Sequence, residues 1–280
     1  MHARCRLILI VLLVCLGEEL VAQERGQRDS SVTPVPIVVG RDLAALGAGA
    51  GLAILAQRVD LRVRNAVRSS DRQDNRALDA LESVGDLWGG GAAVGAGLVL
   101  WSGGRYVGNA TVAASGFRAI EAIAVSGQVT ALLKGVFGRA RPRVDSTSAW
   151  NVRFGRGFSR PRGDYQSMPS GHSTAAFAFA AAVTGEVVRR APAQARLVGV
   201  TTYGLAGITA WSRLHSNAHW LSDVTMGAAI GMVSGWVVTR GHATRPNNRV
   251  DRLILGRALS PFVTSLPQGG TVLGASIVWR

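Results

Sequence analysis

The residues of this chain that could do chemistry form three short groups of cations, histidines and small polar residues. In chain order they are Lys134-x6-Arg141-Pro142, Pro169-Ser170-Gly171-His172 and Ser212-Arg213-x5-His219-x3-Asp223. Phosphoryl transfer needs such residues, because charge spreads over the phosphate oxygens as the ester bond breaks and fixed cations must balance it. The three groups therefore predict a site that binds and transfers a phosphoryl group.

The first task of such a site is to hold the phosphate. Arg141 and Arg213 offer planar forks that can each bind two oxygens, whereas Lys134 supplies a compact point charge. It is the only lysine among 31 basic residues, so composition alone would have placed an arginine there. Ser170 precedes an Ala-rich run and is expected to cap a helix, whose first N–H groups, including that of Gly171, would face the anion.

The second task is bond breaking, which we assign to two histidines. His219 and Asp223 are four residues apart, so on a helix they would share one face and the carboxylate could hold one ring proton. The other ring nitrogen of His219 would then attack phosphorus and form a phosphohistidine. His172 would protonate the leaving oxygen as general acid and later activate water.

These groups closely resemble the three signature motifs of the type 2 phosphatidic acid phosphatase family, which includes bacterial acid phosphatases and, more distantly, vanadium haloperoxidases. The resemblance covers roughly residues 85–240, and all three motifs match without a gap. It implies the phosphate-binding and histidine roles given above. It also implies that no metal and no other cofactor is required.

A metal stripe is the main alternative interpretation of the third group. His215, His219 and Asp223 follow one another at intervals of four residues, a spacing that could hold a cation on a helix. This interpretation leaves Lys134 and His172 without a role, so it is the weaker one. We expect His215 to be an ordinary structural histidine.

Apolar periodicity predicts an all-α fold, a six-helix bundle of the family's kind that is associated with the membrane. The expected helices are 40–57, 86–101, 118–137, 172–189, 197–212 and 220–239. The three motifs would then meet at one end, because the third and fifth helices end where the fourth and sixth begin. The helical phosphatase domain is set at 40–240. A tail at 241–280 would hold a short β-hairpin, with strands at 253–259 and 271–279.

Whether the helices cross a bilayer is left open by the sequence. A span needs about 20 apolar residues, and several runs here are shorter. Closely spaced glycines, at Gly227, Gly231 and Gly235 and around Gly89, favour the tight packing of membrane helices. Six spans after an export signal would place the motifs inside the cell, whereas the family's membrane branch has them outside, so the leader, the span count or the side must differ from this scheme.

The N-terminus predicts export. Residues 1–23 resemble a signal peptide or hydrophobic leader, with Arg4 and Arg6 before an apolar run, and residues 24–39 form an exposed leader. The expected location is the cell envelope, at the membrane. A net charge of +14 could indicate nucleic acid, but no recognition module appears; seven arginines between Arg139 and Arg162 suit an anionic substrate or lipid head groups instead.

The sequence therefore predicts a metal-independent phosphatase of phosphate monoesters or diphosphates. Its substrate would be a lipid phosphate such as phosphatidate, phosphatidylglycerol phosphate or undecaprenyl diphosphate. Three alternatives stay open: an exported acid phosphatase on small soluble esters, a vanadate-dependent haloperoxidase, and a non-catalytic anion-binding protein. Nothing in the sequence indicates the leaving group or the oligomeric state.

Overall fold

The computed structural model describes residues 36–159, 163–245, 248–255, 259–265 and 271–277. The expected signal peptide and nearly all of the expected leader lie outside these residues. Side chains are described up to residue 255, with the exception of residue 253. The account below concerns Ile37–Arg280, which clusters as one unit of the chain.

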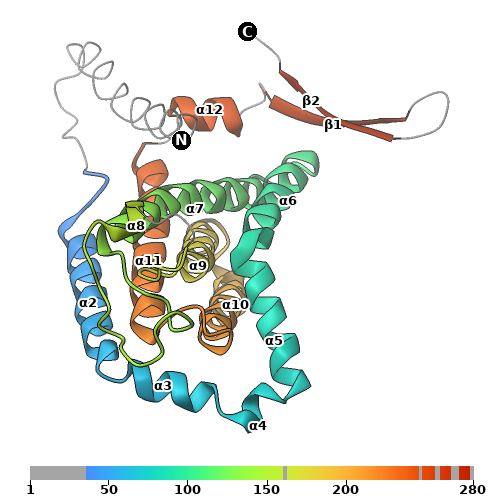
Figure 1. Ribbon diagram of the computed structural model, residues 1–280. Coiled ribbons are helices and arrows are strands. Elements are labelled where there is room, and N and C mark those ends of the chain that lie inside the picture. The colour runs from blue at the N-terminus through green and yellow to red at the C-terminus, as the bar shows by residue number, and fades with distance from the viewer. Residues whose placement is uncertain (1–35, 160–162, 246–247, 256–258, 266–270, 278–280) are drawn as a thin grey trace. The chain divides into compact units, whose positions relative to one another are not determined.

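The described residues are mainly helical (Figure 1). The long helices are α2 (Gly40–Gln57), α5 (Arg76–Leu87), α6 (Ala93–Tyr106), α7 (Ala110–Phe137), α9 (Gly171–Arg190), α10 (Ala195–His215) and α11 (Leu221–Thr244). The short ones are α3 (Asp60–Val67), α4 (Ser70–Gln73), α8 (Arg156–Ser159), α12 (Arg249–Ile254), the π turn η2 (Trp88–Ala92) and the 3-10 turn η3 (Pro192–Gln194).

Helix α9 is the centre of the bundle and packs against α7, α10 and α11 (Figure 1). Its core positions are mostly alanines, among them Ala176, Ala178, Ala180 and Ala182, each fully buried. Small side chains let the neighbouring backbones come close. Around this centre α2 packs on α11, α6 on α7, and α5 on α10.

The contact between α11 and α9 depends on the glycines that the sequence singled out. A Cβ on Gly227 would lie 2.5 Å from the Ser170 oxygen, one on Gly231 2.4 Å from the Thr174 oxygen, and one on Gly235 2.6 Å from the Ala181 Cβ. Real Cβ atoms do not come so near. The predicted close backbone approach is therefore present where α11 runs from Gly227 to Gly235.

Four of the six predicted ranges fall within one helix, and 220–239 begins one residue before α11, but a bundle of six helices is not the full architecture. The second range is part of a longer element, because α5, η2 and α6 follow one another without a break from Arg76 to Tyr106. The described residues add α3, α4, α8 and α12. Six spans are not supported either, since α9 and α10 are too polar to qualify by composition.

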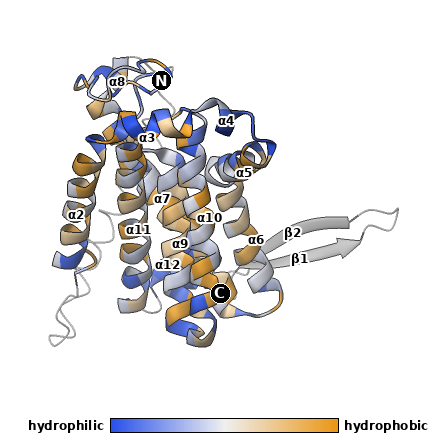
Figure 2. Cartoon of the chain, turned by 90° about the horizontal axis from the view of Figure 1, so that it is seen from below, coloured by the Kyte–Doolittle hydropathy of each residue, from blue (hydrophilic) through white to orange (hydrophobic). Residues whose placement is uncertain are grey.

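Among the residues that the structure describes, three helical stretches are long and apolar enough to cross a membrane: Arg76–Tyr106, Ala110–Phe137 and Leu221–Thr244. A fourth is possible if α2 and α3, which meet at 67°, count as one span. Large apolar side chains such as Leu52, Leu98 and Leu132 are exposed on these helices. Hydrophilic residues gather at the end that carries α3 and α4 (Figure 2).

The C-terminal segment differs in part from the prediction. Residues 249–254 form α12, because Asn248 accepts a hydrogen bond from the Asp251 N–H and caps a helix at this point. The strand expected at 253–259 was therefore placed too early. Strand β1 (Leu259–Ser265) instead pairs antiparallel with β2 (Thr271–Ile277), with Leu259 opposite Ile277.

Candidate active site

The first group of candidate residues is placed by the end of α7. Gly138 has a left-handed backbone with φ of 53°, and its N–H donates to the Lys134 carbonyl to close the helix. A Cβ at Gly138 would lie 2.3 Å from the Arg153 oxygen, so both conformation and space require glycine there. The turn leaves Lys134 in the last helical turn and sends Arg141 into the loop that follows.

The second group lies at the start of α9. The Ser170 hydroxyl accepts a hydrogen bond from the Ser173 N–H and caps the helix, as predicted. The Ser170 N–H donates to the Asp223 carbonyl over 2.9 Å, which joins the second group to the third. Gly171 faces Lys134, because a Cβ at Gly171 would lie 3.8 Å from the Lys134 Cε.

His219 is the point at which the structure corrects the sequence reasoning. The residue precedes α11, which begins at Leu221, so His219 and Asp223 do not share a helical face. They still meet, with His219 Nδ1 3.5 Å from Asp223 Oδ2. The reason is that Asp223 caps α11 by accepting the Trp220 N–H over 2.9 Å, which folds the preceding loop back over the carboxylate.

The other ring nitrogen of His219 identifies its tautomer. Nε2 lies 3.2 Å from an Arg141 guanidinium nitrogen. Arginine can only donate, so Nε2 must carry a lone pair and the ring proton must sit on Nδ1, toward Asp223. The Nδ1 to Oδ2 distance is longer than an ordinary hydrogen bond, as is common for catalytic contacts before substrate binds.

Asp223 is held by a buried network that the sequence did not reveal. Arg139, fully buried, donates to Asp223 Oδ1 over 2.5 Å and to Asp60 Oδ2 over 2.8 Å. Asp60, from α3, also accepts the N–H and the hydroxyl of Ser222. The Ser167 hydroxyl donates a hydrogen bond to Asp223 Oδ2. Both oxygens of Asp223 are therefore held by hydrogen bonds, and the residues that hold them are far apart in the sequence.

A second unpredicted contact comes from α5. Asp86 Oδ1 lies 3.2 Å from His172 Nε2 and 2.6 Å from an Arg213 nitrogen. Glu82, one turn earlier, lies 3.4 Å from Arg213. Asp86 is half exposed, with a side-chain exposure of 53%. One carboxylate thus joins the expected general acid to an expected phosphate ligand while remaining accessible from solvent.

Two glycines allow α5 and η2 to come this close. A Cβ on Gly85 would lie 2.7 Å from the Ser212 Cβ, and one on Gly89 would lie 2.6 Å from the His172 Cβ. The cluster around Gly89 was predicted to permit close helix packing. Its specific effect is to seat His172 against η2.

Burial and nearby cations control the charge of both histidines. Burial lowers the pKa of His219 from 6.5 to about 3. Lys134 and Arg141 also lower it, whereas Asp223 acts to raise it. Burial likewise lowers the pKa of His172 to about 4, helped by Arg213 and opposed by Asp86. Both rings are therefore neutral at pH 7 while no phosphate is bound.

The structure brings together all the residues that the sequence predicted, through direct contacts or through Asp86. It gives His215 a separate place, stacked on Trp211 with ring centroids 4.8 Å apart and 3.5 Å from Asp79. The residues missed were Arg139, Asp60 and Asp86. The position of Arg139 between Lys134 and Arg141 could have indicated a role. It was not recognised because Arg139 is one of seven arginines in that stretch.

Comparison with known proteins agrees with this geometry. The family model of the PAP2 superfamily matches residues 115–247, a stretch that contains all three groups. Residues 115–247 are a PAP2 superfamily segment. A crystal structure of the transmembrane PAP2-type phosphatidylglycerolphosphate phosphatase from Bacillus subtilis superposes with a TM-score of 0.55 at 17% identity, covering 75% of this chain and all of that one. The PAP2 fold is thus shared at low sequence identity.

A curated relative is the lipid A 1-phosphatase of Porphyromonas gingivalis, which is 35% identical over 113 residues. The match covers 40% of this chain and 20% of the relative, so the chain spans about a fifth of that protein's length. The fold shared with a transmembrane PAP2 structure agrees with the long apolar helices of the described residues and indicates a membrane protein.

Proposed function

We propose that this protein hydrolyses the terminal phosphate of a lipid phosphate through a phosphohistidine at His219. The observation that carries the proposal is the placement of His219, whose Nδ1 lies 3.5 Å from Asp223 Oδ2 and whose Nε2 lies 3.2 Å from Arg141, among the cations of the site. A neutral imidazole with a free lone pair is the form that can attack phosphorus. The relatives that are named for lipid phosphates support this substrate class.

In the first step, His219 Nε2 forms a bond to phosphorus and the bond from phosphorus to the ester oxygen breaks. His172 gives its proton to that leaving oxygen. Because His172 is neutral at pH 7 without ligand, it must gain this proton on binding, and the dianionic phosphate beside it favours the charged ring. Arg141 must also turn its donors from Nε2 to the phosphate oxygens.

In the second step, water attacks the phosphohistidine and returns His219 Nε2 as the leaving group. Neutral His172 takes a proton from the water. Lys134, Arg141, Arg213 and the first N–H groups of α9 hold the phosphate oxygens throughout. Inorganic phosphate and the dephosphorylated lipid are the products, and no step needs a metal.

The test is phosphate release by purified wild type and His219→Ala, with EDTA present, on matched panels of detergent-dispersed lipid phosphates and soluble monoesters. We expect release from the lipid panel, lost in the variant. Preference for soluble esters would instead favour an acid phosphatase. Equal release by wild type and variant would overturn the histidine mechanism.

The covalent intermediate needs its own measurement. Acid quenching destroys a phosphohistidine and alkali preserves it, so the phosphoenzyme should be trapped with labelled substrate under alkaline conditions. We expect label on wild type and none on His219→Ala. His172→Asn provides the control, because it keeps the nucleophile and should still accept label if the leaving group is a good one. Absence of label on both wild type and His172→Asn would argue for direct attack by water.

A further inference from the structure

A second cluster of charged residues lies at the other end of the same helices. The candidate active site occupies the start of α9 and of α11. The second cluster occupies their final turns, with Glu186 and Arg190 on α9 and His242 on α11. At 1.5 Å per residue, Asp223 and His242 are about 28 Å apart along α11, close to the roughly 30 Å thickness of the hydrocarbon core. The cluster would therefore lie at the opposite surface of a membrane.

A cavity of about 440 Å³ opens within this cluster. Its walls come from the turn between α6 and α7, the ends of α9 and α11, and α12. The basic residues that line it are Arg105, Arg118, Arg189, Arg190, His242 and Arg252. Asp251 is the one carboxylate in the lining. The volume is within the range of small-ligand sites, and the charge of the walls favours an anion.

Arg118 is the residue that makes this a binding site rather than a charged surface. Arginines near helix C-termini are common because they stabilise the helix dipole, but Arg118 lies in the third turn of α7 and is 1% exposed. It pairs with Asp251 over 2.8 Å and with Glu186 over 3.6 Å. Among the described residues, its second terminal nitrogen, NH1, has no hydrogen-bond partner. A buried cation with an unsatisfied donor on a cavity wall is matched by an anionic ligand.

The acidic residues nearby do not neutralise the site. Glu186 is fully buried and accepts from Arg189 and Arg190, each over 2.7 Å. His242 contacts Glu121 over 2.7 Å and Asp251 over 3.0 Å. These pairs orient the basic side chains around the cavity, yet its five arginines outnumber the three carboxylates Glu121, Glu186 and Asp251.

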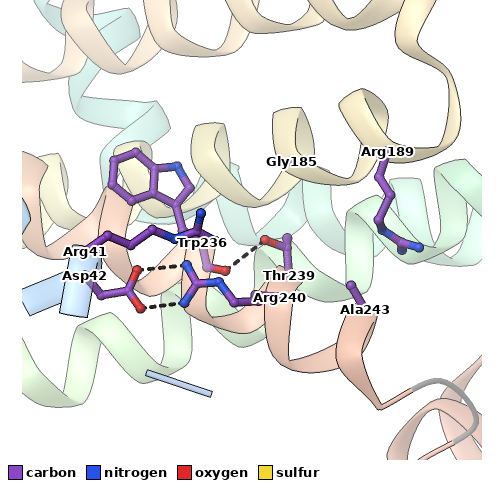
Figure 3. A pocket seen from close by; sticks show the side chains of 8 residues that line it. All are labelled: Arg41, Asp42, Gly185, Arg189, Trp236, Thr239, Arg240 and Ala243. Atoms are coloured by element: carbon purple, nitrogen blue, oxygen red, sulfur yellow. Dashed lines mark hydrogen bonds and ion pairs between the residues drawn. The ribbon is translucent and has the colours of Figure 1, made fainter. Parts of the chain in front are cut away.

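The neighbouring cavity gives a contrast (Figure 3). It has a similar volume, about 440 Å³, and shares Arg189 with the first. Its cation Arg240 is already bound by both oxygens of Asp42, and Trp236 contributes an apolar wall. Arg41 and Arg189 also line it, and Arg240 Nε has no hydrogen-bond partner among the described residues. The difference is that both terminal nitrogens of Arg240 are bound by Asp42, whereas a terminal nitrogen of Arg118 is unpaired.

We propose that the Arg118 cavity binds the phosphate group of an anionic phospholipid in the leaflet opposite the candidate active site. Arginine forks suit phosphate oxygens, and the position at the ends of apolar helices suits a lipid head group rather than a soluble anion. This site is separate from the catalytic residues and its ligand is not hydrolysed.

The test uses the His219→Ala protein in detergent, so that no turnover is involved and failure of the proposed function would not affect the result. Thermal unfolding is followed while phosphatidylglycerol, a phosphodiester lipid, or phosphatidylcholine is added. The binding variant is Arg190→Gln with Arg252→Gln, because both residues are exposed and Arg189 still pairs with the buried Glu186 when Arg190 is lost. The matched control is Arg58→Gln with Arg62→Gln, two exposed arginines near the other end of the bundle.

We expect phosphatidylglycerol to raise the unfolding temperature more than phosphatidylcholine. The binding variant should need at least about tenfold more lipid for the same rise, because it lacks two charge-assisted contacts, and the control should behave as its parent. Equal effects of the two lipids, or an unchanged response of the binding variant, would overturn the proposal. If inorganic phosphate alone raised the unfolding temperature and the binding variant did not respond, the ligand would be a free phosphate and the lipid proposal would be overturned.

Discussion

At the scale of the residue, the candidate site is defined by how each titratable side chain is held. His219 has one nitrogen toward Asp223 and one toward Arg141, and Asp223 has each oxygen occupied by a donor. Asp60 and Asp86 do not belong to the sequence motifs. The first reaches His219 through Arg139 and Asp223, and the second touches His172 directly.

Asp60→Asn tests the buried network. The change leaves Arg139 with one charged partner inside the protein, and breaking a buried ion pair destabilises by about 3 to 5 kcal/mol. We expect a lower unfolding temperature and, in the protein that remains folded, a lower kcat with KM little changed, because Asp223 would be held less firmly. Asp71→Asn on exposed α4 is the control and should alter neither quantity. A normal kcat in folded Asp60→Asn would mean that the network is structural only.

Asp86→Asn tests the charge of His172. Asp86 raises the pKa of that ring, so the variant should have a still lower pKa. A general acid works only while protonated, and the alkaline limb of kcat/KM against pH should therefore move to lower pH. Glu82→Gln is the matched control, since Glu82 contacts Arg213 but not His172. The same displacement in both variants would point to an effect through Arg213 instead.

At the scale of the element, glycines decide how near the helices stand and hence where the catalytic groups lie. Gly89 brings η2 against His172, and Gly227 brings α11 against the Ser170 carbonyl. These are contacts between helices that carry motifs and helices that support them. Loss of such a glycine would move a functional residue as well as loosen the packing.

Gly89→Ala makes this measurable. Its Cβ would lie 2.6 Å from the His172 Cβ and 2.7 Å from the Thr209 Cγ2, and overpacking of this kind destabilises by about 1 to 3 kcal/mol. We expect a lower unfolding temperature together with lower phosphatase activity. Gly95→Ala is the control, because no atom lies within 4 Å of its Cβ position. It should unfold at the same or a slightly higher temperature.

At the scale of the whole molecule, buried His219 and partly buried His172 link stability to pH. Their pKa values fall from 6.5 to about 4 and about 3 on folding, so the folded protein binds fewer protons than the unfolded chain between these limits. Stability must then decrease as pH falls from about 6.5 toward 3. The effect belongs to the ligand-free protein, because a bound phosphate would favour protonation.

Thermal unfolding of the detergent-solubilised protein at pH 7 and pH 4.5 measures this dependence. We expect a lower unfolding temperature at pH 4.5 and a smaller difference in His219→Gln, which lacks one of the two groups. His215→Gln serves as the comparison for loss of a structural histidine. A difference as large in His219→Gln as in wild type would exclude His219 as a source of the pH dependence.

The sequence by itself determined the residue types of the candidate site, the ranges of the main helices and the end of the bundle at which the motifs meet. These features are local: apolar periodicity marks a helix, and Ser170 or Gly138 marks where one starts or stops. The order of the helices then places Lys134, His172 and Arg213 at one end, whatever the details of packing.

Only the tertiary structure decided which groups surround those residues. Arg139 meets Asp60 and Asp223 across separations of 79 and 84 residues, and no periodicity or spacing records such a pairing. The same holds for Asp86 at His172 and for Arg118 at its cavity. His219 shows the limit in a single residue: its contact with Asp223 was expected from a helix and is made by a loop, because the carboxylate caps α11 and draws that loop back.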